Sequence, residues 1–196
     1  TMPHALIGYA GDTVRAVEMV RDAFPERPIV ALVDYFGREV TDALAVCRRF
    51  PDEAARGELS IRLDTPGERY LEGLNAQTSS RLLAKHAPDA LSEEGEWGEE
   101  AFLIGPGVSA AAVFHLRNTL DAAGFPKVKI VCSSGFNADK CRAFARADAP
   151  VDAIGTGSFL PAAWSDTYAT ADVVAYDGAR RVKAGREWLA DADPTG

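Results

Sequence analysis

Polar residues directly follow several short apolar runs, at positions where they could do chemistry together. Asp34 follows Ile29–Val33, and Asp64 follows Leu59–Leu63 with Arg62 two residues before it. If each run is a strand of a parallel sheet, the residues after it lie at the carboxyl edge, where α/β proteins place their sites. Two carboxylates there could hold Mg²⁺ with substrate phosphates, or stabilise a ribosyl centre that becomes positive as a leaving group departs.

Arg62 and Thr65 flank Asp64 and are candidates for binding substrate. Side chains alternate along a strand, so Arg62 points to the same side as Asp64. Inside a barrel, the guanidinium could pair with a substrate carboxylate. An internal ion pair with Asp64 or Asp34 explains the arginine equally well.

Two later segments combine glycines with hydroxyl residues after apolar runs. They are Ser133-Ser134-Gly135 after Val128–Cys132, and Gly155-Thr156-Gly157-Ser158 after Val151–Ile154. Glycine lets backbone N–H groups approach an anion, hydroxyls add donors, and the helix that follows favours negative charge. Barrels commonly bind phosphate in loops of this kind, so we predict a phosphate site here, although tight βα turns are the structural alternative.

His4 is the histidine placed to act in such a site. It precedes the apolar run Ala5–Tyr9, which we predict to be a strand, whereas His86 and His115 are expected to be structural. The sequence contains no HExxH, Walker A or Ser-His-Asp pattern that would favour another chemistry. We therefore predict His4, Asp34 and Asp64 as catalytic residues and the two carboxylates as metal ligands.

The elements that must position these residues alternate along the chain. Besides the runs already named, Ala101–Ile104 and Val173–Tyr176 are predicted as strands. Helices are expected after Asp12 and Asn137 as N-caps, and around the apolar positions of 40–47 and 108–120. This pattern predicts an α/β fold with parallel strands, either an irregular, TIM-like (β/α) barrel or an open doubly wound sheet. No GxGxxG follows the first run, which favours the barrel.

Composition restricts the function further. With 196 residues, 47% hydrophobic and 26% charged, the sequence is typical of one globular domain. A net charge of −8 argues against a nucleic-acid surface, so backbone donors and metal must hold any phosphate locally. Three cysteines without CxxC spacing, and no signal peptide or membrane span, predict a cytoplasmic protein with reduced thiols. The acidic stretch 92–100 is expected to be a surface loop. Because Thr1 begins almost directly on the predicted site, we expect that a longer protein continues upstream.

Taken in order, these motifs resemble the C-terminal part of nicotinate phosphoribosyltransferases, which are related more distantly to the nicotinamide and quinolinate enzymes. The resemblance covers nearly the whole chain and rests on residues 1–7, 11–13, 31–34, 61–66, 130–137, 151–158, 171–178 and 182–186. It implies an irregular α/β barrel over residues 1–178 with a C-terminal extension at 179–196. It also implies sites completed by an absent N-terminal domain, often from a neighbouring subunit of a homo-oligomer, so we expect no turnover from this chain alone.

The resemblance also implies a reaction. The family transfers phosphoribosyl from phosphoribosyl pyrophosphate to nicotinate with Mg²⁺, giving nicotinate mononucleotide and pyrophosphate in NAD salvage. His4 lies where a histidine can be phosphorylated when ATP is coupled, Arg62 and Asp64 lie beside pyridine and ribose, and the 5′-phosphate maps to Ser134, Gly135, Thr156 and Gly157. A quinolinate-type transferase and a non-catalytic phosphoribosyl-binding domain are the alternatives, and the presence of Arg62, Asp64 and His4 together disfavours the second.

Overall fold

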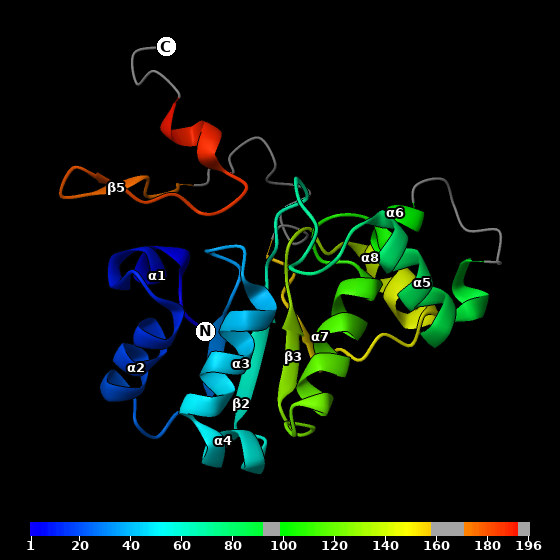
Figure 1. The fold of residues 1–196 in the computed structure, drawn as a ribbon, viewed down its shortest axis with the longest axis horizontal. Coiled ribbons are helices and arrows are strands. Elements are labelled where there is room, and N and C mark those ends of the chain that lie inside the picture. Colours follow the sequence, from blue (N-terminus) through cyan, green and yellow to red (C-terminus); the bar gives the residue numbers. More distant parts are fainter. Residues whose placement is uncertain (92–98, 158–170, 192–196) are drawn as a thin grey trace.

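The protein, described from a computed structural model over residues 1–91, 99–157 and 171–191, contains a parallel sheet with helices packed on it (Figure 1). The strands are β1 (Ile29–Leu32), β2 (Leu59–Leu63), β3 (Lys129–Cys132) and β4 (Ala153–Ile154). They pair in parallel in the order β1-β2-β3-β4. Four predicted strands are thereby confirmed. Their sequential order is that of a TIM-like barrel rather than of a doubly wound sheet, but within the described ranges the barrel is not closed.

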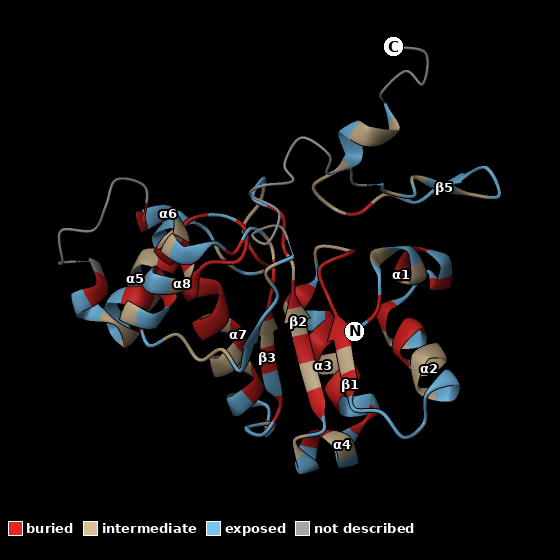
Figure 2. Ribbon diagram, turned by 180° about the vertical axis from the view of Figure 1, so that it is seen from behind, coloured by how far each residue is buried: buried red, intermediate tan, exposed pale blue. Residues whose placement is uncertain are grey.

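Each strand leads to the next through helices. α3 (Glu39–Arg49) and α4 (Pro51–Arg56) join β1 to β2. β2 and β3 are joined by α5 (Ala76–His86), the 3₁₀ helix η1 (Pro88–Leu91), α6 (Glu99–Ile104) and α7 (Ala110–Ala122), and α8 (Ala138–Arg146) joins β3 to β4. Right-handed crossovers between neighbouring parallel strands put their helices on one face. Figure 1 shows α3 on this face, and Figure 2 shows β1 to β3 from the other side with no helix across them.

The two faces of the sheet differ in composition. Residues that face the helices are almost fully buried and apolar: Ile29, Ala31, Val33, Leu59, Ile61, Leu63, Ile130 and Cys132. On the opposite face the register aligns Leu32 with Arg62 and Arg62 with Val131. Two residues further along, the same face carries Asp34, Asp64 and Ser133. The period of two therefore separates the core from the polar residues of the predicted site.

Two predicted strands are helices, and part of the predicted acidic loop is not a loop. Residues 5–9 lie in α1 (His4–Ala10), whose buried positions Ile7, Gly8 and Ala10 follow helical spacing. A Cβ atom on Gly8 would lie 2.6 Å from the Tyr35 hydroxyl oxygen, so glycine lets α1 pack closely there. Residues 101–104 belong to α6, because short apolar runs do not distinguish strand from helix. The acidic stretch lies outside the described residues at 92–98, but Glu99 begins α6 and is buried, with an ion pair to Arg146 at 2.5 Å.

All four predicted helices are present as α2 (Thr13–Ala23), α3, α7 and α8. Asp12 caps α2 by accepting a hydrogen bond from the Arg15 amide, and Asn137 caps α8 in the same way. Ser109 caps α7. Residues 171–191 form the hairpin β5 (Ala175–Tyr176) and β6 (Ala179–Arg180) and the 3₁₀ helix η3 (Glu187–Ala190), above the carboxyl ends of the strands in Figure 1. None of the described helices has the length and apolar character to cross a membrane.

Candidate active site

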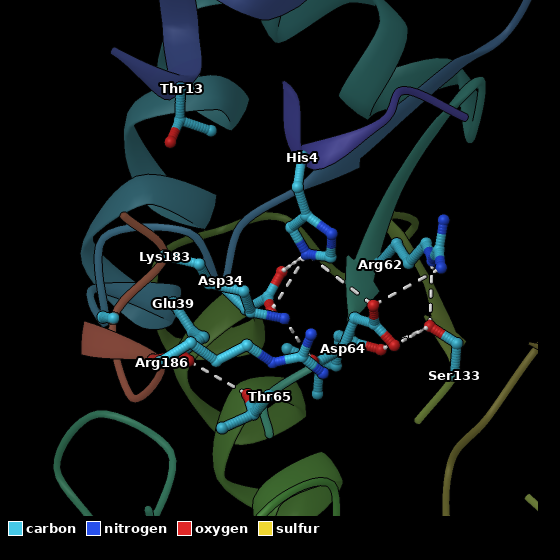
Figure 3. Close-up of polar contacts among 12 residues, drawn as sticks. His4, Thr13, Asp34, Glu39, Arg62, Asp64, Thr65, Ser133, Lys183 and Arg186 are labelled. Carbon is cyan, nitrogen blue, oxygen red and sulfur yellow. Dashed lines mark hydrogen bonds and ion pairs between the residues drawn. The ribbon is translucent and has the colours of Figure 1, made fainter. Parts of the chain in front are cut away.

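Asp34 is the buried centre of the candidate site (Figure 3). Its carboxylate accepts hydrogen bonds from His4 Nε2, at 3.0 and 3.3 Å, and forms an ion pair with the Lys183 ammonium. Burial acts to raise the pKa of Asp34, but the hydrogen bond from His4 and the charge of Lys183 outweigh it and lower the pKa to about 2. Asp34 is therefore a carboxylate at neutral pH, held by two partners from opposite ends of the chain.

Arg62, Asp64 and Ser133 form a second cluster at the ends of β2 and β3. The Arg62 Nε donates to the Ser133 hydroxyl oxygen at 2.9 Å, and that hydroxyl lies 2.8 Å from Asp64 Oδ1. A weaker Arg62–Asp64 ion pair, at 3.6 Å, confirms the internal pairing that the sequence left open. Since Arg62 also lines both cavities described below, this pairing leaves it facing the space where a ligand could bind.

His4, Asp34 and Asp64 converge closely enough to hold a cation. One ligand atom from each lies within 4.8 Å of the others, and His4 Nε2 is 3.7 Å from Asp64 Oδ2. The two carboxylates fit the oxygen preference of Mg²⁺, and they lie beside the predicted phosphate loops. His4 reaches them from the first position of α1, not from the residue before a strand as predicted.

The glycine-rich loops line a cavity of about 440 Å³ beside this cluster. Its wall includes Ser133, Ser134, Gly135, Gly155 and Gly157, together with His4, Arg62, Asp64 and Lys183. Ser134 and Gly135 have positive φ angles of 80° and 67°, so two consecutive residues adopt the left-handed conformation. Thr156 does not line the cavity, and Ser158 lies outside the described residues.

A second cavity of about 280 Å³ adjoins the first and is more apolar. Its lining includes Met2, Leu32, Tyr35, Val182 and Leu189. Both cavities share one set of polar residues: His4, Arg62, Asp172, Lys183 and Arg186. A ligand with an apolar part and an anionic part could therefore occupy both spaces and pass His4, which lines both.

Thr65 is in a different place from the one expected of a substrate-binding residue. It is fully buried, lines neither cavity, and donates its hydroxyl to Glu39 Oε1 at 2.9 Å. Glu39 is also buried and pairs with Arg69 at 2.5 Å, and Arg69 donates to the Asp34 carbonyl at 2.9 Å and to the Ala184 carbonyl. These contacts tie the loops after β1 and β2 to the C-terminal segment, so the Thr65 hydroxyl supports the site from within the core.

The sequence interpretation assigned no role to Lys183, Arg186 or Asp172. Lys183 is 5% exposed, and Arg186 pairs with Asp172 at 2.7 Å at the rim of both cavities. All three come from the closing part of the chain, and the contacts of Lys183 to the Asp34 carboxylate and the Asp64 carbonyl span more than a hundred residues. Lys183 and Arg186 belong to the stretch Val182–Arg186, which formed part of the family resemblance. That resemblance was the one feature of the sequence that could have indicated their place in the site.

Comparison with known proteins leaves the family open but identifies a similar structure. No family model matches the sequence, and no curated protein matches it. Among solved structures, the chain resembles a nicotinate-nucleotide pyrophosphorylase from Pyrococcus furiosus, with a TM-score of 0.50 and 25% sequence identity. The alignment covers 79% of this chain and 29% of that chain, so this chain spans less than a third of the length of the structure it resembles.

Proposed function

We propose that this chain carries the phosphoribosyl-binding part of a phosphoribosyltransferase that acts on a pyridine carboxylic acid. In this reaction phosphoribosyl pyrophosphate loses pyrophosphate from C1 of the ribose, and the pyridine nitrogen forms the new bond to that carbon. The observation that carries the proposal is the His4, Asp34 and Asp64 cluster beside the glycine-lined cavity, with His4 lining the more apolar cavity as well. The likeness to a nicotinate-nucleotide pyrophosphorylase supports this reaction class.

We assign each part of the substrate a place from the residues that line the two cavities. The 5′-phosphate would bind in the larger cavity against Ser134, Gly135 and Gly157. The Gly155 amide already donates to the Cys132 carbonyl at 2.8 Å, so Gly155 would contribute space rather than a donor. The pyridine ring would occupy the smaller cavity beside Tyr35, with Arg62 and Arg186 available for its carboxylate. The ribose would then lie against Asp64, whose negative charge stabilises the positive centre that forms as pyrophosphate departs.

We also propose Mg²⁺ as a cofactor of the reaction and consider whether ATP is coupled to it. Asp34 and Asp64 would hold Mg²⁺, which would neutralise the pyrophosphate as it leaves. ATP coupling is expected only if His4 accepts a phosphoryl group. Its Nε2 faces two carboxylates at 3.0 and 3.7 Å, which would repel that group unless a cation lay between them.

Quinolinate is the pyridine acid that we propose first, with nicotinate second. The similarity to a nicotinate-nucleotide pyrophosphorylase fits a quinolinate-type enzyme better than one that uses nicotinate directly. A dicarboxylic acid also requires more cationic contacts than a monocarboxylic acid, and Arg62, Lys183 and Arg186 all line the cavities.

Calorimetric titration of this chain tests the proposal. We expect Mg²⁺–phosphoribosyl pyrophosphate to bind more tightly than inorganic phosphate, and quinolinate to bind the resulting complex more tightly than nicotinate. Gly157→Val places a side chain in the larger cavity and should weaken the binding of both phosphate ligands. Gly67→Val is the matched control, because Gly67 also has open space around it but does not line that cavity. A folded chain that binds neither phosphate ligand would refute the proposal.

A further inference from the structure

A buried lysine lies behind the glycine-rich loop that follows β3. Lys140, in the first turn of α8, is 7% exposed and lines neither cavity. Its ammonium donates a 2.8 Å hydrogen bond to the Ser134 carbonyl. Three aromatic rings surround the same nitrogen, Phe136 at 4.5 Å, Phe144 at 5.9 Å and Phe102 at 6.0 Å from their centres. The lysine therefore contacts the loop from the core side while the loop faces the ligand space.

The charge of Lys140 has no carboxylate partner among the ion pairs of the described residues. The titratable groups that face it are Cys132 on β3, Asp64 after β2 and Cys141 on its own helix. Burial is the dominant influence and lowers the pKa of Lys140 to about 8, although these three groups act in the opposite direction. A buried ammonium is costly, and cation–π contacts offset only part of that cost. The structure thus keeps an incompletely balanced positive charge beside the larger cavity.

The loop that Lys140 contacts has a conformation that needs support. Ser134 has a φ of 80°, which costs a non-glycine residue roughly 1 kcal/mol or more. A backbone carbonyl next to a phosphate also repels it, unless a donor occupies that oxygen. The hydrogen bond from Lys140 to the Ser134 carbonyl meets both needs, since it fixes the turn and balances the oxygen's negative charge.

We propose that Lys140 is a positioning residue for the bound phosphate. It holds the Ser134–Gly135 turn from behind, and its charge stabilises an anion on the cavity side without touching it. The inference rests on the phosphate site of the proposed function and adds to it the source of positive charge. It has a measurable consequence, because a bound dianion favours the charged form of the lysine. The chain should therefore take up protons when phosphate binds at a pH just above 8.

Calorimetry with inorganic phosphate at pH 8.5, in three buffers of different ionisation enthalpy, measures that proton uptake. At this pH phosphate is already a dianion, so its own titration would release protons rather than take them up. For the unaltered chain we expect net uptake. Lys140→Met, whose apolar side chain suits the three phenylalanines, should abolish the uptake and weaken binding by about tenfold, the size expected for losing one nearby charge. Lys140→Arg should restore part of the affinity but none of the proton uptake, because a guanidinium is already charged at this pH.

Arg142→Met is the matched control, because Arg142 is exposed on the same helix and its replacement also exchanges a basic side chain for methionine. It should alter neither affinity nor proton uptake. Phosphate binding that a folded Lys140→Met variant leaves unchanged would overturn the inference alone. Failure of the unaltered chain to bind phosphate would overturn the proposed phosphate site and the inference with it. If Lys140→Met does not fold, the titration of the unaltered chain still tests the inference. Phosphate binding without proton uptake at pH 8.5 would overturn it.

Discussion

Replacing Asp34 with asparagine should unbalance the most buried charges of the candidate site. The carboxylate is fully buried, and it neutralises Lys183, which is itself 5% exposed. Its pKa is about 2 in the folded protein and 3.8 as the reference value. By linkage, this difference corresponds to about 2 kcal/mol of stability at neutral pH. Removing one partner of a buried ion pair costs about 3–5 kcal/mol, so we expect Asp34→Asn to lose about 2–5 kcal/mol of unfolding free energy.

Urea unfolding at pH 7 measures this loss, and a double-mutant cycle assigns it to the ion pair. Lys183→Met alone should also destabilise the chain, because it leaves Asp34 buried and charged with His4 as its remaining partner. The double variant should be more stable than the sum of the two single losses predicts, since it removes both charges together. Asp139→Asn is the control, because that carboxylate pairs with Arg142 at the surface and should cost no more than about 1 kcal/mol.

The pH dependence gives an independent check with a definite sign. A carboxyl group whose pKa is lowered by folding contributes its stability in full above the reference pKa of 3.8 and loses it as the pH falls through about 2. The unaltered chain should therefore lose stability over this acidic range more steeply than Asp34→Asn. Additive losses in the double-mutant cycle, together with parallel acid profiles, would refute the described Asp34–Lys183 pairing.

Two further predictions concern buried groups next to the site. Thr65→Val should lower the unfolding free energy by about 1–3 kcal/mol in urea titrations, because Glu39 loses a buried hydrogen-bond donor. Thr65→Val should leave the affinity for phosphate unchanged. A loss of phosphate affinity without a loss of stability would show that Thr65 binds the ligand. Cys47 and Cys132 should not react with a thiol reagent at pH 8 in the native chain, because burial raises the pKa of each thiol to about 12. Only the partly exposed Cys141 should react, and a second fast thiol per native chain would contradict the described packing.

The sequence predicted the parts of the fold in which local pattern and tertiary role agree. The runs at 29–33, 59–63 and 128–132 are strands in the structure, because their β-branched and apolar residues pack against helices on one face. Residues at the same relative position after these strands could be recognised as site candidates, because parallel strands bring their carboxyl ends together. The sequential strand order then followed from simple crossovers between neighbours.

The sequence did not predict features that depend on contacts between distant segments. Residues 5–9 had enough apolar character for a strand, but Gly8 fits α1 against Tyr35 and helical spacing buries Ile7 and Ala10. The role of Lys183 depends on a segment that returns over the strand ends after more than a hundred residues. Nothing in the local sequence distinguishes such a lysine from an exposed one.

An acidic chain can hold an anion through cations that it keeps away from solvent. The net charge of −8 led to the expectation that backbone donors and metal alone would bind phosphate. The structure adds Lys183, which lines the larger cavity, and Lys140, which lies behind the Ser134–Gly135 turn; they are 5% and 7% exposed. Lys183 pairs with Asp34, so that in the proposed site the carboxylate would not repel a nearby phosphate, whereas Lys140 donates to the Ser134 carbonyl from the core. Because neither charge is open to solvent, salt screens both weakly, and the proposed phosphate site would need no positive surface around it.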